Sequence, residues 1–284
     1  HDKICRTQPL RTHMKAEYRL NRTKTALMNG EVVKVPEINR VFDPTVVETI
    51  AEVGYGCVWV DMEHSHVDFR DLSTLVLAAR ARDLDVFVRI PHGPYNQVIK
   101  TLELGASGLI WPHCKTADEA RAFVKMAKFH PKGLRGMGGG RDSGFGNADK
   151  PEYFDLANDN VLLGVMIEDA EGVEACEEIA AVDGIDLLFV APGDLSQSYG
   201  VHREPGSPIA QPRVLAAFDR VGEACRANGK AMGTAVDPGD AMKLAAERGT
   251  TWFNCCHDVN ALTIGYTSAF EATDATISAS KTNG

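Results

Sequence analysis

Two carboxylates in the middle of the chain follow short apolar runs, and their positions indicate cation chemistry. The run Leu162–Ile167 is followed at once by Glu168. The run Leu187–Val190 is followed by a short turn and then by Asp194. Two carboxylates held close together either shift each other's pKa or share a cation, and we favour a shared divalent cation. The alternative is that each is an ordinary surface acid at the end of a strand.

The segment between the two runs determines how these acids are arranged. Gly172–Ala181 has the amphipathic spacing of about three helical turns. A strand–helix–strand unit of this length suits a right-handed parallel crossover, which brings the carboxyl ends of both strands to one side of a sheet. Glu168 and Asp194 are therefore predicted to lie side by side.

Three further side chains near strand ends could act on a substrate. Arg89 lies in the otherwise apolar run Phe87–Pro91, and a guanidinium there needs an anion, either on a ligand or on one of the metal-site acids. A purely structural ion pair with one of those acids is the open alternative. Asp61 and His64 follow the run Cys57–Val60, so Asp61 could fix the His64 tautomer and make the imidazole a general base.

Other chemically capable residues carry weaker signals. His113, Asp237 and His257 also follow predicted strands, but the sequence offers no partner for them, which favours surface roles. The glycine cluster Gly136–Gly140 lacks the context and the Lys-Ser/Thr ending of a phosphate loop, so we reject that interpretation. The surrounding stretch His130–Asn160 has no sustained periodicity, which predicts a long functional loop or lid.

The elements that must position these residues alternate regularly between strand and helix. This alternation predicts a single-domain (β/α)8 TIM barrel, whose strands all open toward one active-site face. A doubly wound open sheet is the alternative, and the absence of a dinucleotide-binding glycine pattern counts against a Rossmann site. The predicted strands are Glu31–Ile38, Cys57–Val60, Val86–Ile90, Leu109–Trp111, Leu162–Ile167, Leu187–Val190, Ala231–Val236 and Thr251–Cys256.

Length, charge and composition predict the extent of the barrel and exclude several classes of partner. The barrel is predicted over residues 21–270, after an N-terminal arm of residues 1–20 and before a flexible polar tail of residues 271–284. The net charge of −9 gives no basic footprint, so we expect no nucleic-acid partner. We expect no membrane span or signal segment, because no sufficiently long apolar run exists. The seven cysteines show no zinc or CxxC spacing, which predicts reduced thiols and a cytoplasmic location.

The strand ends carry an ordered set of short segments. They are DMEH at 61–64, FVRIP at 87–91, LGASGLIWPH at 104–113, GLRG at 133–136, MIE at 166–168 and APGDLS at 191–196. Taken in order, these segments resemble the HpcH/HpaI family of metal-dependent class II aldolases, from about residue 24 to residue 270. The resemblance implies a (β/α)8 barrel that binds Mg²⁺, Mn²⁺ or Co²⁺. It also implies a carbon–carbon lyase that cleaves a 4-hydroxy-2-oxo acid to pyruvate and an aldehyde through a metal-stabilised enolate.

The resemblance also implies roles for individual residues. Glu168 and Asp194 would be the metal ligands, and Arg89 would stabilise the carbonyl oxygen and the enolate. Backbone amides around Gly193 and Asp194 would hold the pyruvate carboxylate.

The remaining implied roles concern the proton and the aldehyde. His64, oriented by Asp61, would transfer the proton together with a water on the metal. The aldehyde half would lie against the loop Gly136–Gly146 and against His92-Gly93.

The chain departs from the family pattern at three places that bear on the substrate. Met166 stands where many of these aldolases have Gln, Ala191 stands where Gly is common, and Arg141-Asp142 replaces small or apolar residues. Related enolate chemistry, such as oxaloacetate decarboxylation or a citrate-lyase-like cleavage, is therefore an alternative. A barrel that only binds is a third.

The C-terminal helix carries a prediction about assembly. The segment Val259–Ala269 is apolar and almost uncharged, so it needs to pack against a barrel. The resemblance implies a hexamer built from dimers that exchange this helix. The alternative is an ordinary eighth helix that packs on its own barrel.

Overall fold

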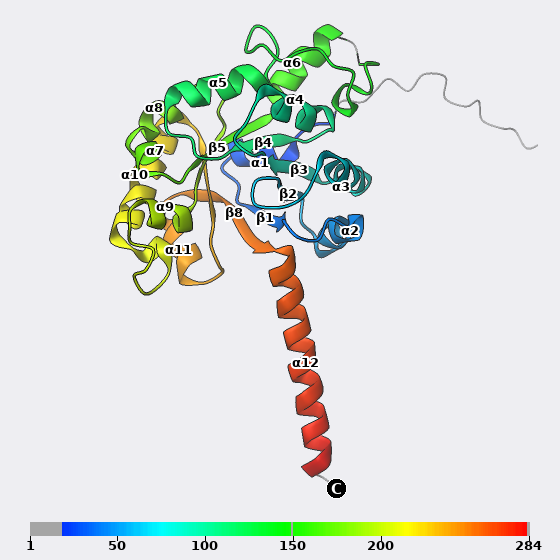
Figure 1. Ribbon diagram of the computed structural model, residues 1–284, viewed down its shortest axis with the longest axis vertical. Helices are drawn as coiled ribbons and strands as arrows, with labels where there is room; N and C mark the ends of the chain where they lie inside the picture. The colour runs from blue at the N-terminus through cyan, green and yellow to red at the C-terminus, as the bar shows by residue number, and fades with distance from the viewer. Residues whose placement is uncertain (1–18, 149, 283–284) are drawn as a thin grey trace, which may run out of the picture.

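The computed structural model describes residues 19–148 and 150–282, which form a closed parallel barrel (Figure 1). The strands hydrogen-bond in sequence order, and the last pairs with the first. This confirms the predicted (β/α)8 barrel, and the open-sheet alternative is wrong. The strands are β1 (Val33–Ile38), β2 (Cys57–Asp61), β3 (Asp85–Arg89), β4 (Gly108–Trp111), β5 (Leu162–Ile167), β6 (Leu187–Val190), β7 (Ala231–Ala235) and β8 (Thr250–His257).

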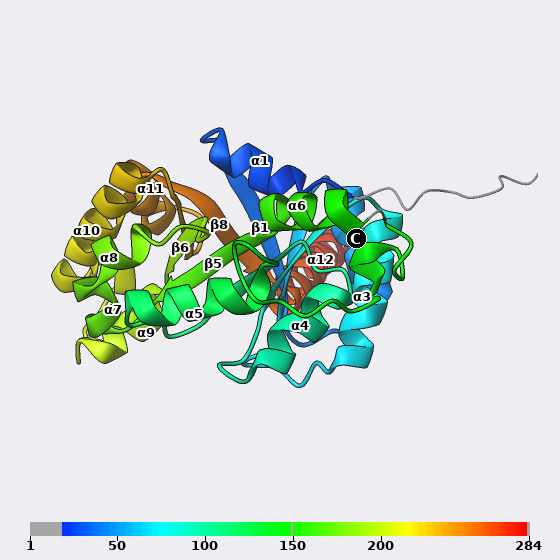
Figure 2. The same cartoon turned by 90° about the horizontal axis from the view of Figure 1, so that it is seen from above.

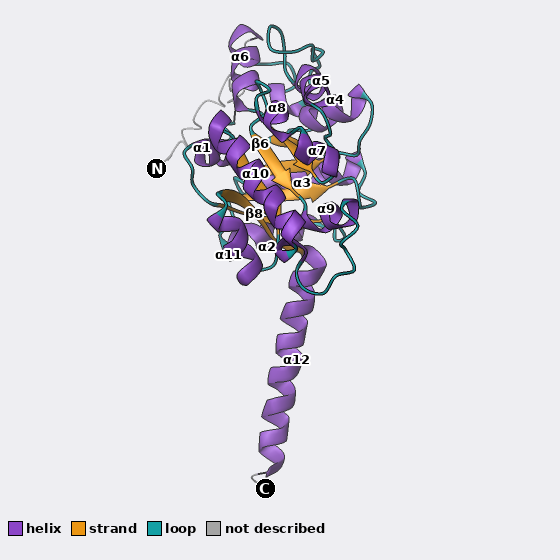
Figure 3. Ribbon diagram, turned by 90° about the vertical axis from the view of Figure 1, so that its left-hand side faces the viewer, coloured by secondary structure: helices purple, strands orange, loops and turns teal. Residues whose placement is uncertain are grey.

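Helices surround the strands on the outside of this ring (Figures 2 and 3). In the described part of the chain no helix is long and apolar enough to cross a bilayer. The helices are α1 (Arg22–Met28), α2 (Pro44–Val53), α3 (Phe69–Ala81), α4 (Tyr95–Glu103), α5 (Ala117–Ala127), η1 (Arg141–Ser143), α6 (Lys150–Asn160), α7 (Ala170–Glu174), α8 (Cys176–Ala180), α9 (Pro192–Ser198), η2 (Pro208–Ala210), α10 (Pro212–Asn228), α11 (Asp240–Glu247) and α12 (Asp258–Thr282).

Alternation along the strands divides the core into two parts. Inward-facing side chains fill the barrel, where Trp59, Phe87, Phe189 and Trp252 meet with ring centroids 4.8–6.1 Å apart. The intervening Val and Leu side chains face outward and pack against the helices. Strands of a parallel barrel are therefore apolar on both faces, which is why they appear in the sequence as short unbroken apolar runs.

The stretch His130–Asn160 differs from the prediction of a long loop. It contains η1 and the eleven-residue helix α6. Only a short stripe of α6 is buried, because Tyr153 and Ala157 pack against Phe129 in a small cluster apart from the main core. A stripe of this length leaves too weak a periodicity to predict a helix.

The C-terminal helix also differs from its predicted extent. α12 continues to Thr282, so most of the polar segment predicted as a flexible tail is helical. Asp258 is buried and accepts hydrogen bonds from the backbone N–H groups of residues 39–41 at 2.7–3.1 Å, whereas residues 259–280 are exposed. α12 thus projects from the barrel and does not pack on it (Figure 1). The predicted N-terminal arm falls outside the described residues, except for Arg19 and Leu20.

The tight packing between β4 and β5 gives a stability prediction. A Cβ at Gly108 would lie 2.6 Å from the Leu162 carbonyl oxygen and 2.8 Å from the Phe87 ring. Gly108→Ala should therefore lower the free energy of unfolding by about 1–3 kcal/mol in a denaturant titration. Gly56→Ala is the control, because no atom lies within 4 Å of the added Cβ. Equal stability of the two variants would contradict this packing.

Candidate active site

Inward-facing positions change from apolar to polar as β2 and β3 reach their carboxyl ends. Side chains alternate across a strand, so Asp61 faces the barrel interior like Trp59, two residues earlier. Arg89 follows Phe87 in the same way on β3. The parallel register pairs Asp61 with Arg89, which places an acid and a base beside each other at the mouth of the barrel.

Asp61 and Arg89 form a two-point ion pair. Arg89 Nε donates to Asp61 Oδ1 at 2.8 Å and Arg89 Nη2 donates to Asp61 Oδ2 at 2.6 Å. Burial opposes charge on both groups, but their mutual contact outweighs it, so the pKa of Asp61 is lowered and the pKa of Arg89 is raised. Both residues are therefore charged at neutral pH. Arg89 does form a structural ion pair, but its partner is Asp61 and not one of the metal-site acids considered from the sequence.

The second end of the guanidinium is not taken up by Asp61. Arg89 Nη1 lies 3.4 Å from Glu63 Oε2 and 3.9 Å from the Met166 sulfur. Glu63 Oε2 is buried and accepts no hydrogen bond from a described residue. Arg89 can therefore face a ligand through Nη1 while Asp61 holds its other side.

The predicted orientation of the His64 ring by Asp61 is wrong. Asp61 Oδ1 accepts from the backbone N–H groups of Glu63 and His64, at 3.0 and 3.4 Å. The His64 ring is exposed, and its Nε2 lies 3.8 Å from Glu63 Oε2. The physical reason is that Arg89 already occupies both oxygens of Asp61.

A cavity of about 300 Å³ at this mouth collects most of the predicted site residues. Its floor is apolar, and it includes Met166 and Ala191, two of the positions that depart from the family pattern. Sequence reasoning missed Glu37 and Asn254 in its wall, although Val35 and Trp252, two residues before each, face the same interior. The predicted residues that line the cavity are Asp61, His64, Arg89, Gly193 and Asp194.

Glu168 lies beside this cavity and not in its lining. It follows β5 directly, is buried, and its Oε1 accepts from the His113 backbone N–H at 2.7 Å. Burial raises its pKa, and the negative charges of Asp194 and Glu63 raise it further, against the effect of His113. The parallel register pairs Ile167 of β5 with Val190 of β6, so Glu168 and Asp194 follow the carboxyl ends of adjacent strands.

His113 has acidic partners that the sequence did not reveal. Its Nδ1 lies 2.9 Å from Asp169 Oδ2 and 3.6 Å from Glu168 Oε1. Burial lowers its pKa, but the hydrogen bond to Asp169 and both negative charges dominate, so the pKa is raised. These contacts link the end of β4 to the end of β5 beside Glu168.

The loop Gly136–Gly146 does not line this cavity, so its predicted contact with an aldehyde is wrong. Gly138 and Gly140 instead approach Glu103 at the end of α4, at the opposite end of the barrel. His92 stacks against Trp111 with ring centroids 4.7 Å apart.

The two acids fit a hard divalent cation. Glu168 Oε2 and the exposed Asp194 carboxylate accept no hydrogen bond from a described residue. No group of three or more His, Cys, Asp or Glu side chains within the described ranges is arranged to hold an ion. Mg²⁺ and Mn²⁺ prefer oxygen ligands, and Mg²⁺ keeps several waters, so two carboxylates completed by water and a ligand would suffice.

Comparison with known proteins identifies relatives across most of the chain. The profile of the HpcH/HpaI aldolase/citrate lyase family matches residues 40–263. A 4-hydroxy-2-oxovalerate aldolase of Rhodococcus jostii is 37% identical over 187 residues, which cover 66% of this chain and 70% of the relative. A 4-hydroxy-4-methyl-2-oxoglutarate aldolase of Chaetomium globosum is 35% identical over 222 residues, 76% of this chain and 80% of the relative.

A solved structure shares the same architecture. The HpcH/HpaI aldolase/citrate lyase family protein of Burkholderia cenocepacia superposes with a TM-score of 0.82 at 31% identity. The superposition covers 89% of this chain and 99% of that protein.

The Asp61–Arg89 pair gives a testable energetic prediction. Asp61→Asn leaves a mostly buried guanidinium without its two-point partner, so the free energy of unfolding should fall by about 3–5 kcal/mol. The double variant Asp61→Asn/Arg89→Met should be more stable than Asp61→Asn alone, because the guanidinium that lost this partner is then also removed. Denaturant titrations of both variants would measure this.

A surface pair provides the control. Asp118 accepts from Arg121 at 2.7 Å, and both side chains are more than half exposed. Asp118→Asn should therefore cost at most about 1 kcal/mol. If Asp61→Asn lowers the free energy of unfolding by no more than Asp118→Asn does, the Asp61–Arg89 pair contributes no more to stability than a surface ion pair.

Proposed function

We propose that this chain, which belongs to the HpcH/HpaI aldolase/citrate lyase family, cleaves a 4-hydroxy-2-oxo acid to pyruvate and an aldehyde with the help of a divalent cation. Its aldolase-named relatives support a carbon–carbon lyase. One observation carries the proposal: the Asp194 carboxylate and the fixed guanidinium of Arg89 line one small cavity, and the buried Glu168 carboxylate lies beside it. A 2-oxo acid needs this combination, because negative charge develops on its oxygen when the carbon–carbon bond breaks.

Glu168 and Asp194 would hold the cation. A bound divalent cation would supply Lewis-acid stabilisation of the 2-oxo group and help to orient it. The proposal names the class of ion, a divalent cation such as Mg²⁺, Mn²⁺ or Co²⁺, and does not choose among the three.

The substrate carboxylate would be held at the start of α9. Gly193 and Asp194 stand in the first turn of this helix, and their backbone N–H groups have no acceptor among the described residues. Pro192 occupies the first helical position and brings no N–H of its own. Two N–H groups pointing out of the helix suit a carboxylate.

Arg89 would face the oxygen on which negative charge develops. Its Nη1 is the end left available by Asp61, which fixes the other end by two hydrogen bonds. A donor that is already oriented costs no reorganisation when the charge appears. Asp61 is therefore a positioning residue for Arg89.

His64 would take the proton of the 4-hydroxyl group. Its exposed ring lines the cavity, and no described residue forms a hydrogen bond with the ring that would prevent its rotation. Loss of this proton lets the C3–C4 bond break, so the aldehyde leaves and the bonding electrons form the enolate of pyruvate. Protonation at C3 then completes pyruvate.

Product analysis tests this function directly. The protein with Mn²⁺ should convert 4-hydroxy-2-oxovalerate, or another 4-hydroxy-2-oxo acid of a small panel, to pyruvate and an aldehyde in equal amounts. Enzymatic pyruvate assay and aldehyde derivatisation would measure both. Release of CO₂ from oxaloacetate without any aldehyde-forming reaction would favour the decarboxylase alternative, and an absence of both cation and 2-oxo acid binding would favour a non-catalytic barrel.

The metal ligands give a second prediction. Glu168→Gln and Asp194→Asn each remove one charged ligand, so each should lose most bound Mn²⁺ and at least about 10²-fold in kcat. Equilibrium dialysis with metal analysis measures occupancy, and the exposed acid Asp237 supplies a matched control as Asp237→Asn. Full Mn²⁺ occupancy in both variants would show that Glu168 and Asp194 are not the metal ligands.

We also infer that α12 packs on the barrel of a second copy, within a hexamer of helix-exchanged dimers. Tyr266 and Phe270 are each 74% exposed, and Leu262 and Ile264 are 45% and 61% exposed, on a helix that leaves its own barrel. So much apolar surface is not left in water. Light scattering at micromolar concentration should give a hexameric mass, and Tyr266→Glu/Phe270→Glu should give a smaller species. A monomeric mass of the unaltered chain would reject the exchange.

A further inference from the structure

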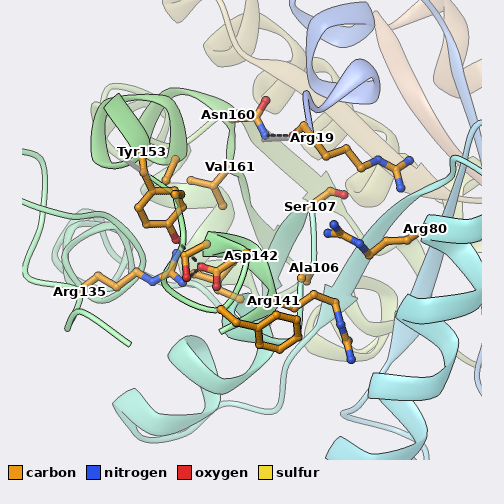
Figure 4. A pocket seen from close by; sticks show the side chains of 17 residues that line it. Arg19, Arg80, Ala106, Ser107, Arg135, Arg141, Asp142, Tyr153, Asn160 and Val161 are labelled. Carbon is orange, nitrogen blue, oxygen red and sulfur yellow. Dashed lines mark hydrogen bonds and ion pairs between the residues drawn. The ribbon is translucent and has the colours of Figure 1, made fainter. Parts of the chain in front are cut away.

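Figure 4 shows a second cavity, of about 340 Å³. Its lining residues place it at the opposite end of the barrel from the candidate active site. It opens beside Ser107 and Val161, which directly precede β4 and β5. Glu168 follows the other end of β5. Six residues of strand separate the two ends by roughly 20 Å, so a ligand here would not touch the reacting atoms.

The charged side chains that line this cavity are mostly basic. Four arginines and one carboxylate face it among the described residues, in a chain whose net charge is −9. The basic residues are Arg19, Arg80, Arg135 and Arg141, and the acid is Asp142.

The single carboxylate of the lining, Asp142, already accepts hydrogen bonds from two side chains. Asp142 Oδ2 accepts from Arg135 Nη2 and from the Tyr153 hydroxyl, both at 2.5 Å. Arg135 Nε is buried and has no hydrogen-bond partner in the described part of the chain. Asp142 therefore balances Arg135 and leaves the other three cations of the cavity without a counterion in its lining.

Arg80 is the least compensated of these three. It extends from α3 toward Ser107 and Ala106 in the cavity wall (Figure 4). Its guanidinium has no hydrogen bond and no ion pair with any described residue. Burial lowers its pKa and the neighbouring charge of Arg141 lowers it further, against the opposing charge of Asp142, so Arg80 keeps a positive charge that Asp142 only partly compensates.

Arg141 is held only by neutral groups, and Arg19 has two carboxylates nearby but no hydrogen bond from its guanidinium to them. Arg141 donates to the Leu104 carbonyl at 2.8 Å and to Ser73 Oγ at 3.2 Å, both neutral groups. Arg19 has Asp83 and Asp85 at 3.4 and 3.5 Å, yet its Nε and Nη2 are buried without a hydrogen-bond acceptor. Donors that are oriented, charged and unsatisfied form a site for an anion, since guanidinium forks match carboxylate and phosphate groups.

We propose that this cavity binds a small organic polyanion that carries phosphate or carboxylate groups, with Arg80 as its principal contact. The site is separate from the one proposed for catalysis, and its ligand would act as an effector or stabiliser of the fold. Phosphate and carboxylate share the chemistry that the arginines recognise, and separate probes distinguish them.

Calorimetric titration of the full-length protein without added divalent cation tests the proposal, with pyrophosphate and citrate as separate probes. At least one probe should bind with one site per chain and raise the Tm. Arg80→Gln and Arg141→Gln should each weaken binding at least tenfold. Arg70→Gln, on the same helix but outside the cavity, and Arg89→Lys, in the other cavity, should leave the affinity unchanged.

The Tm without a probe separates a binding role from a structural one. Arg80→Gln should keep the Tm within about 1 °C or raise it, because Arg80 forms no hydrogen bond or ion pair with a described residue and its burial opposes the charge. The proposal is overturned if neither probe binds, if Arg70→Gln weakens binding as much as Arg80→Gln, or if only Arg89→Lys abolishes it.

Discussion

The pairing of Asp61 with Arg89 is the contact on which the candidate active site depends. The register of β2 and β3 sets two inward-facing charged groups side by side above a floor of large aromatic side chains. Burial acts against the ionised form of each group, and the contact between them offsets that cost. Together they hold a guanidinium at a fixed angle, with Nη1 turned to Glu63 and Met166. Every role proposed for Arg89 follows from that orientation.

The barrel itself could be predicted because its signals are local and repeated. Leu162–Ile167 and Leu187–Val190 coincide with β5 and β6, since strands buried on both faces are unbroken apolar runs. The partners of individual side chains were harder to predict from the sequence, because they depend on the register between neighbouring strands. Asp61 lies three residues from His64 in the sequence, yet it does not contact the His64 ring. Its carboxylate instead accepts two hydrogen bonds from Arg89 on the next strand. Glu63 and His113 were missed as site neighbours for the same reason.

The remaining differences arise where the chain leaves the barrel. α6 buries too few side chains for its periodicity to be visible, and the helical end of α12 is built from small polar residues that also suit a tail. The polar residues of the loop 136–146 gave no indication that Arg141 and Asp142 would meet Arg135 and Arg80 at the far end of the strands. The two ends of the barrel thus have different electrostatics, with several acids around one arginine at the carboxyl ends and four arginines around one acid in the cavity at the other end.

Formation of the pyruvate enolate is the step in which the carboxylates and Arg89 would act together, and it can be observed without any aldehyde. Exchange of the pyruvate methyl protons in D₂O, followed by NMR with Mg²⁺ and the full-length protein, measures it. The unaltered protein should catalyse exchange, whereas Arg89→Lys should slow it by about 10²-fold or more, because the lysine ammonium cannot reproduce the fork held by Asp61. Exchange by Arg89→Lys at the rate of the unaltered protein would contradict this account of the site.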